Sequence, residues 1–223
     1  MKKMSNKGFT LIELLAVITI MGILMMVAIP SVSRTIENSR RDTFADNVRT
    51  YINTVRNAAL ADELKCYSSA NSASDTAERS YSATPDGYYF YRICTIQAKE
   101  GSDTLCTPGA TEDLMETVAK SSWGSADLYG VVMWHKYTST SGTKSQKTDY
   151  SAVFADTALH GMNNISKELS IKRSTILTSG ALAKTDVYKK IAEVDNQKAY
   201  ECVIDGASFN TTYAGVAKNG NYK

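Results

Sequence analysis

The stretch KGFTLIELLAVITIMGILMMVAIP, residues 7–30, decides how this chain begins its fold and where it resides. Residues 9–29 carry a single charge, on Glu13. A helix of that length spans about 31 Å, which matches the hydrocarbon core of a bilayer. Lysines precede the apolar run, so the positive-inside tendency predicts a cytoplasmic start and an exported body. We therefore expect one membrane-spanning segment.

Glu13 is the anomaly in this segment, because an ionisable group inside a bilayer costs about 2.5 to 3.5 kcal/mol on insertion scales. Neither a plain membrane anchor nor a secretory signal peptide explains it, and residues 27–30 offer no small-residue cleavage site. No lysine or arginine lies between Phe9 and Pro30. A cut between Gly8 and Phe9 would place a new amine one helical turn before Glu13 and so supply the missing cation.

Residues 8–13, GFTLIE, behind a short lysine-containing leader, resemble the class III signal of type IV pilins and pseudopilins. The resemblance extends over residues 7–56. It implies that a membrane prepilin peptidase cuts after Gly8 and methylates the new amine of Phe9. It also implies that Glu13 of an incoming subunit pairs with the Phe9 amine of a subunit already in a filament.

Gly22 and Pro30 fall where that family often weakens its helix. Proline removes one backbone hydrogen bond and favours a kink, which membrane helices commonly tolerate. The resemblance implies more, namely that the interval between the two residues melts on assembly.

After Pro30, apolar residues recur at spacings of three and four, so the helix should continue as an amphipathic helix to about residue 64. Its apolar face, formed by Val48, Ile52, Val55 and Ala59, should pack on an antiparallel sheet. The expected fold class is therefore α+β, as in pilins. The expected organisation is a leader (1–8), a transmembrane and assembly half-helix (9–29), an amphipathic half-helix (30–64) and a β-rich head (65–223).

The head contains four aromatic or β-branched runs that predict strands. They are residues 87–96, 128–137, 150–154 and 199–204. Residues 67–84 predict a loop and residues 112–121 and 186–194 short helices, whereas residues 164–179 suit either a strand or a helix.

The four cysteines lack the C-x-x-C spacing of zinc or redox sites, and their even number in an exported chain favours two disulfides. Four cysteines permit three pairings, among which the sequence does not choose. We favour the short loop, Cys94 with Cys106, which leaves Cys66 to reach Cys202.

Composition and motifs exclude several other functions. Without the three leader lysines the chain has 22 basic and 23 acidic residues, so the body has no overall charge bias towards nucleic acid. His135 and His160 lack the spacing of a metal site, and we expect no cofactor or metal. The rival from another class is a membrane-anchored enzyme. It would depend on Ser141 and Lys144, which match the S-x-x-K motif within a loop.

The resemblance implies a structural subunit, not an enzyme, that leaves the membrane for an extracellular type IV pilus on the cell surface. Adhesion, motility or DNA uptake would follow. The implied partners are further copies and other pilins, prepilin peptidase, the assembly platform in the inner (cytoplasmic) membrane, and lipid before assembly. The alternative is a pseudopilin of a type II secretion or competence system, although the loop-rich body with four cysteines favours a displayed pilin.

Overall fold

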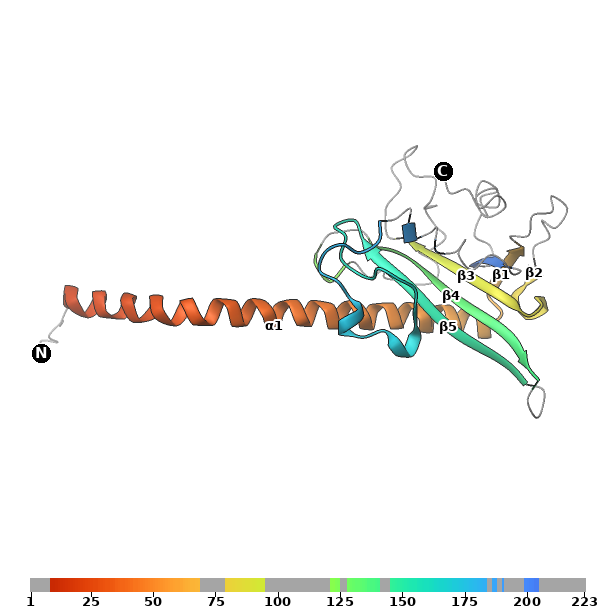
Figure 1. The fold of residues 1–223 in the computed structure, drawn as a ribbon, viewed down its shortest axis with the longest axis horizontal. Coiled ribbons are helices and arrows are strands. Elements are labelled where there is room, and N and C mark those ends of the chain that lie inside the picture. Colours follow the sequence, from red (N-terminus) through yellow and green to blue (C-terminus); the bar gives the residue numbers. More distant parts are fainter. Residues whose placement is uncertain are drawn as a thin grey trace, which may run out of the picture. The chain divides into compact units, whose positions relative to one another are not determined.

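The computed structural model describes residues 9–68, 79–94, 121–124, 128–140, 145–183, 186–187, 190 and 199–204. The chain divides into two compact units, Met1–Ser39 and Arg40–Lys223. Helix α1 (Leu11–Leu60) supplies the described helical residues of the first unit and continues into the second. Figure 1 labels this helix and the main strands.

The described part of the first unit consists mainly of the apolar part of α1, whose large hydrophobic side chains are exposed all round the helix. Within the described part of the chain, α1 is the one helix long and apolar enough to cross a membrane. An apolar surface of this kind requires lipid or other helices around it.

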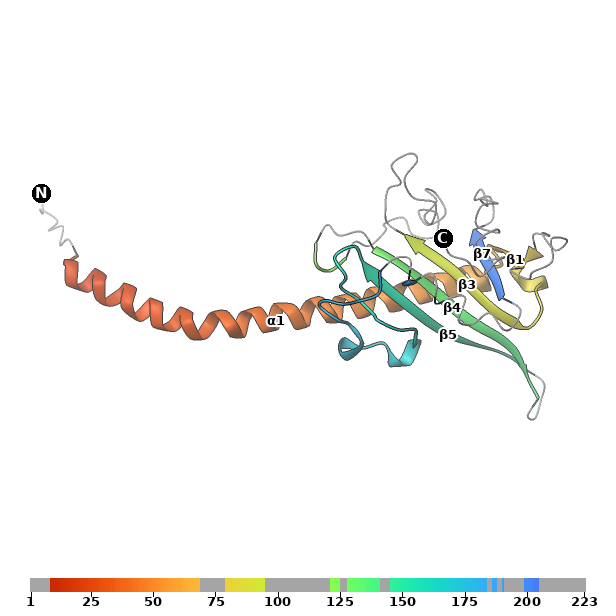
Figure 2. The same cartoon turned by 45° about the horizontal axis from the view of Figure 1, so that its top comes forward.

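In the second unit, one face of α1 is buried and the other is polar. The predicted core face is confirmed, since Val48, Ile52 and Val55 are fully buried and Ala59 is 6% exposed. The remaining buried positions of the helix are Phe44, Ala45, Tyr51 and Ala58. Figures 1 and 2 show this part of α1, in orange, lying along one face of the sheet.

The helix ends at Leu60, four residues earlier than the sequence predicted. Asp62 adopts a left-handed conformation with φ 58°, and its N–H bonds to the carbonyl of Ala59 at 3.3 Å. The N–H of Glu63 reaches back to the carbonyl of Ala58 at 3.0 Å. These two bonds form a Schellman motif, which closes the helix and turns the chain into β1. Leu64, the predicted last helical residue, is instead the first residue of that strand.

The described strands form one sheet in the order β2-β1-β7-β3-β4-β5-β6. Their bounds are β1 Leu64–Ser68, β2 Arg79–Ser80, β3 Gly87–Cys94, β4 Leu128–Ser139, β5 Ser145–Asp156, β6 Ser166–Lys167 and β7 Ala199–Ile204. Neighbouring strands are antiparallel except β3 and β7, which pair in parallel. The α+β fold is confirmed, with one parallel pair that the sequence did not indicate.

The four predicted strands correspond to β3, β4, β5 and β7. The clearest difference is β5, which begins at Ser145 rather than at residue 150 because its polar first half pairs with the end of β4. The predicted loop is partly strand, since β1 reaches Ser68 and β2 precedes a 3₁₀ turn, η1 (Tyr81–Ala83). Residues 69–78 lie outside the described residues.

Residues 164–179, which the sequence left undecided, contain β6 and two 3₁₀ helices, η2 (Glu168–Ser170) and η3 (Arg173–Thr175). In the predicted helix 186–194, Asp186, Val187 and Lys190 are helical, and the rest lies outside the described residues. The predicted helix 112–121 also lies outside them, apart from Ser121.

Aromatic rings pack against one another in the core between α1 and the sheet. Tyr51 of α1 stacks on Phe154 of β5, with ring centroids 5.0 Å apart. Phe154 lies across Gly130 of β4, where an added Cβ would meet its ring at 2.2 Å. Glycine is therefore required at this position by close packing.

Strand β7 joins β1 and β2 to the rest of the sheet, and a disulfide holds it there. Cys66 of β1 and Cys202 of β7 lie directly opposite each other and are bonded. Their predicted pairing is therefore present in the structure. Because this bond closes a loop between residues 136 positions apart, we expect it to stabilise the head by about 2–5 kcal/mol. Cys106 and the side chain of Cys94 lie outside the described part of the chain.

Candidate functional site

The N-terminal turn of α1 is closed by hydrogen bonds between Thr10 and Glu13. The N–H and the hydroxyl of Thr10 donate to the Glu13 carboxylate at 2.8 and 2.7 Å. In return, the N–H of Glu13 donates to the Thr10 hydroxyl oxygen at 3.4 Å. This reciprocal arrangement is a capping box, in which Thr10 is the N-cap and Glu13 the third helical residue.

The capping box changes the interpretation of Glu13. The carboxylate has partners within its own chain and lies at the positive end of the helix dipole. Sequence reasoning sought a cation for it and missed Thr10, although T-x-x-E before an apolar run is a capping-box signal. One carboxylate offers about four acceptor positions, so these bonds leave room for a further donor such as the Phe9 amine.

Gly22 and Pro30 both lie inside the continuous helix α1. A Cβ added at Gly22 would meet nothing within 4 Å, so no neighbour in the chain requires glycine there. What glycine does bring is a lower helix propensity, by about 1 kcal/mol relative to alanine. The two residues therefore bound an interval of α1 with weaker intrinsic helix stability.

In the head, arginines attach the segment 161–183 to α1. Arg49 donates to the carbonyl of Ile171, and Arg56 pairs with Glu168. In the opposite direction, Arg173 of η3 pairs with Asp42 of the helix. Arg49 and Arg56 lie off the apolar stripe of α1, and the spacing of that stripe does not reveal that a distant segment contacts them.

Arg56 has a second contact, because its guanidinium lies 4.6 Å from the ring centroid of Tyr150 on β5. Burial raises the pKa of the Tyr150 hydroxyl above its ordinary value, so this ring stays neutral beneath the cation. The segment 161–183 and the sheet are thus joined through one helix residue.

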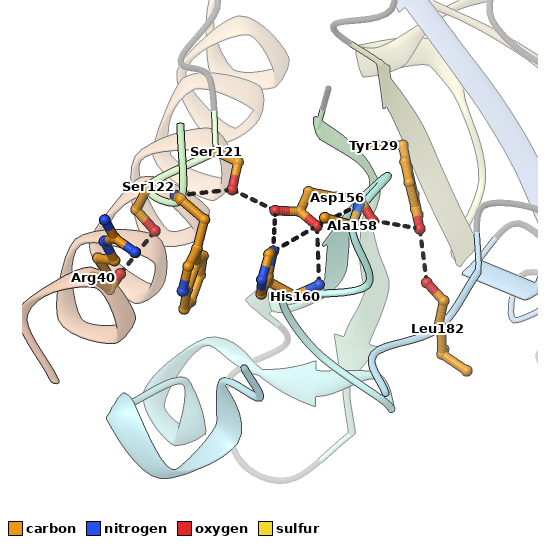
Figure 3. Close-up of polar contacts among 9 residues, drawn as sticks. Arg40, Ser121, Ser122, Tyr129, Asp156, Ala158, His160 and Leu182 are labelled. Carbon is orange, nitrogen blue, oxygen red and sulfur yellow. Dashed lines mark hydrogen bonds and ion pairs between the residues drawn. The ribbon is translucent and has the colours of Figure 1, made fainter. Parts of the chain in front are cut away.

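A second polar cluster surrounds Asp156, at the end of β5 (Figure 3). Its fully buried carboxylate accepts bonds from the Ser121 hydroxyl at 2.5 Å and from the backbone and ring nitrogens of His160 at 2.9 Å. The hydroxyl of Ser122 donates to the Arg40 carbonyl at 2.8 Å. These contacts tie residues 121–124 to α1 and to the sheet.

The Asp156 cluster is structural in its geometry. The carboxylate stands between Ser121 and His160, whereas a nucleophilic triad places the histidine between the serine and the acid. Trp123 stacks on the His160 ring at 4.6 Å between centroids. Tyr129 lies beside the cluster, and burial raises the pKa of its hydroxyl to about 12.

The other histidine, His135 on β4, stacks between two tyrosines. Its ring centroid lies 4.3 Å from that of Tyr88 and 4.9 Å from that of Tyr137. Among the described residues no group of three or more His, Cys, Asp or Glu side chains could hold a metal ion. Ser141 and Lys144, the S-x-x-K pair, lie outside those residues.

The comparison with protein families gives one finding, which concerns the start of the chain. Residues 3–29 match the family model for the prokaryotic N-terminal methylation motif. The chain therefore carries a type IV pilin-like class III signal, which supports the type IV pilin or pseudopilin family. No curated protein and no solved structure matches the chain.

Three statements follow from this match together with the fold. Proteins with this signal are generally structural rather than enzymatic, and the signal implies processing by a prepilin peptidase and assembly with other pilins. The exposed apolar helix and the signal support membrane insertion before assembly. The disulfide and the α+β head are consistent with a pilin-like protein.

Proposed function

We propose that this chain is a structural subunit of a type IV pilus, cut after Gly8, methylated at Phe9 and assembled into an extracellular filament. One observation carries the proposal: a carboxylate sits in the first turn of an exposed apolar helix of membrane-spanning length, inside the matched methylation motif. In an ordinary membrane anchor that carboxylate would cost free energy of insertion with nothing to compensate for it.

In the membrane, before assembly, the capping box keeps the Glu13 carboxylate hydrogen-bonded to Thr10 of its own chain. Thr10 supplies two donors, so the carboxylate is not left without partners at the membrane surface or within it. Cleavage then creates an amine on Phe9. When a new subunit reaches the base of the filament, its Glu13 receives the Phe9 amine of a subunit already assembled, and the two charges compensate each other in an apolar setting.

The rest of the apolar helix supplies contact area rather than specificity. On assembly, side chains such as Leu15 and Ile18 exchange lipid contacts for contacts with neighbouring helices, an exchange with little hydrophobic gain. The Glu13 pair and the fit between helices must therefore determine the register. We further propose that the interval from Gly22 to Pro30 unwinds during this step and gives the filament its flexibility.

Glu13→Gln tests the ion pair. Glutamine keeps the length of the side chain and an acceptor for Thr10, but it removes the charge. We expect wild-type membrane insertion and cleavage, with filament yield reduced by roughly tenfold or more, since truncating one partner of a desolvated charge pair costs about 2–5 kcal/mol. Filaments sheared from cells and quantified against the membrane pool give the measurement. A normal filament yield from Glu13→Gln would contradict the pairing.

The length of the assembled filament separates the proposed pilin from a pseudopilin. A pilus subunit should occur at native expression levels in long filaments outside the cell, labelled by an antibody against the head. Recovery of the processed chain only in the cell envelope, with no such filaments, would assign it to a secretion or competence pseudopilus.

A further inference from the structure

The head has a pocket of about 620 Å³ beside α1 that carries more positive than negative charge. It lies between the helix and the start of η3, and its residues are Arg41, Asp42, Ala45, Asp46, Arg49, Lys172, Arg173 and Ser174. Four cationic side chains against two carboxylates leave a net charge of +2. We call this feature the basic pocket.

The internal pairs of the basic pocket account for both carboxylates. Arg173 pairs with Asp42 and holds the pKa of that carboxyl below its ordinary value. Arg49 pairs with Asp46 at 2.8 Å. Lys172, which is exposed and lines the pocket, offers an ammonium group to a carboxylate from outside.

The other end of the same half-helix carries carboxylates. Asp62 accepts hydrogen bonds from the Ser82 N–H and hydroxyl at 2.8 and 2.9 Å, and Glu63 beside it is exposed. Asp86 accepts a bond from the N–H of Thr138 at 2.7 Å. Hydrogen bonds from the Ser80 side chain and from Ser82 lower the pKa of Asp62, and a hydrogen bond from the Thr138 side chain lowers the pKa of Asp86, so both stay ionised at neutral pH. We call Asp62, Glu63 and Asp86 the acidic end.

Two lysines lie near the acidic end. The ammonium group of Lys136 is buried and donates to the carbonyl oxygens of Tyr81 and Thr84, at 3.4 and 2.9 Å. It faces into the head, where its desolvation lowers its pKa. Lys65, on β1, is partly exposed and adds positive potential beside Asp62. Glu63 is therefore the carboxylate of this group best placed for an outside partner.

The two features are separated by about 30 Å along α1, at a helical rise of about 1.5 Å per residue from Arg41 to Asp62. Among the described residues, the cationic side chains of the basic pocket outnumber its carboxylates, and at the other end of the half-helix the three carboxylates of the acidic end outnumber Lys65 and Lys136. A head-to-tail contact between identical copies is heterologous, and its repetition generates an open helical filament. Opposite charges at opposite ends favour that contact over a contact between like ends.

We infer that the basic pocket receives the acidic end of a second copy of this chain, with Lys172 of one copy beside Glu63 of the next. This inference rests on the proposed filament function and adds to it a contact between heads. It assigns register-setting charges to the head, in addition to the Glu13 pair in the apolar helix.

Zero-length cross-linking of filaments tests the contact directly. A carbodiimide joins an amine to a carboxylate as an amide, with loss of one water taken up by the reagent, and it requires the two groups to touch. We expect mass spectrometry of treated filaments to find Lys172 linked to Glu63, Asp62 or Asp86, and the same link to be absent from detergent-dispersed subunits. Filaments whose cross-links omit Lys172 would overturn the inference and leave the proposed function standing.

Charge exchange gives a second test. Lys172→Glu and Glu63→Lys should each lower filament yield roughly tenfold, because each places like charges together, and the double variant should recover most of the loss. Lys167→Glu, an exposed lysine of the same segment outside the pocket, is the matched control and should assemble normally. Thermal melting of the dispersed heads checks folding. A double variant as poor as either single variant would contradict the pairing, whereas a wild-type chain that forms no filament at all would contradict the proposed function itself.

Discussion

The two parts of α1 have the same backbone conformation but expose opposite kinds of surface. In residues 11–39 the large apolar side chains are exposed on every face, whereas in residues 40–60 they form one buried stripe. The first part lacks a partner within the described chain, and the second part has the sheet. The difference indicates that the first part needs an apolar environment from outside the subunit, which we propose is lipid and then the helices of other subunits.

The largest effect that separates the two parts is the cost of removing a buried side chain. Ile52→Ala should lower the free energy of unfolding of the head by about 2–5 kcal/mol, because Ile52 is fully buried against the sheet. Ile18→Ala, in the apolar part, is the matched control and should change the stability of the head by less than about 0.5 kcal/mol. Urea unfolding of the detergent-dispersed protein, followed by near-UV circular dichroism, gives both values. Equal losses would show that the two parts are not independent in the subunit.

A smaller effect tests the capping box at the start of the apolar part. Thr10→Ala removes the side-chain acceptor and donor and should destabilise the first turn of α1 by about 1 kcal/mol. Thr10→Ser keeps the hydroxyl and should retain most of the wild-type stability. Amide hydrogen exchange of residues 11–14 in micelles measures the difference. If residues 11–14 exchange at the same rate in the alanine and serine variants, the Thr10 hydroxyl does not stabilise the first turn of α1.

The smallest effect concerns the weak interval within the apolar part. Gly22→Ala should raise local helix stability by about 0.5–1 kcal/mol, since the added methyl group meets no neighbour in the chain. Ala16→Gly, six residues earlier, should lower it by a similar amount. Exchange protection around residue 22 is the readout. If protection is unchanged in Gly22→Ala, glycine is not the origin of any weakness between Gly22 and Pro30.

The sequence predicted the helix well because its two periodicities are strong and local. An uninterrupted apolar run and a stripe at spacings of three and four identify the two parts of α1, and β-branched and aromatic runs identify β3, β4 and β7. The end of the helix was predicted wrongly because the Leu64 position continues the helical pattern. What stops the helix is the left-handed backbone at Asp62, together with the bonds that Ser80 and Ser82 donate to its carboxylate from 18 and 20 residues away.

The polar contacts of the head could not be predicted from the residue type at each position alone. Arg49, Arg56 and Arg173 acquire their partners only when residues 161–183 cross α1, over separations of more than 100 residues. The Thr10–Glu13 pair is different, because the T-x-x-E pattern of a capping box is present in the sequence. It was missed because only a cation was considered as the partner of Glu13. Local motifs can therefore be recovered from the sequence, whereas contacts made by chain crossing need the structure.

We propose that Glu13 belongs to an ion pair whose cation is made by processing, and the mature N-terminus tests this pair most directly. Peptide mass spectrometry of the chain recovered from filaments should identify N-methylated Phe9 as the first residue, with residues 1–8 absent. That result would show that each assembled subunit carries the methylated amine with which Glu13 of an incoming subunit is proposed to pair. A mature chain that retains Gly8 and the residues before it would lack the amine and contradict the account.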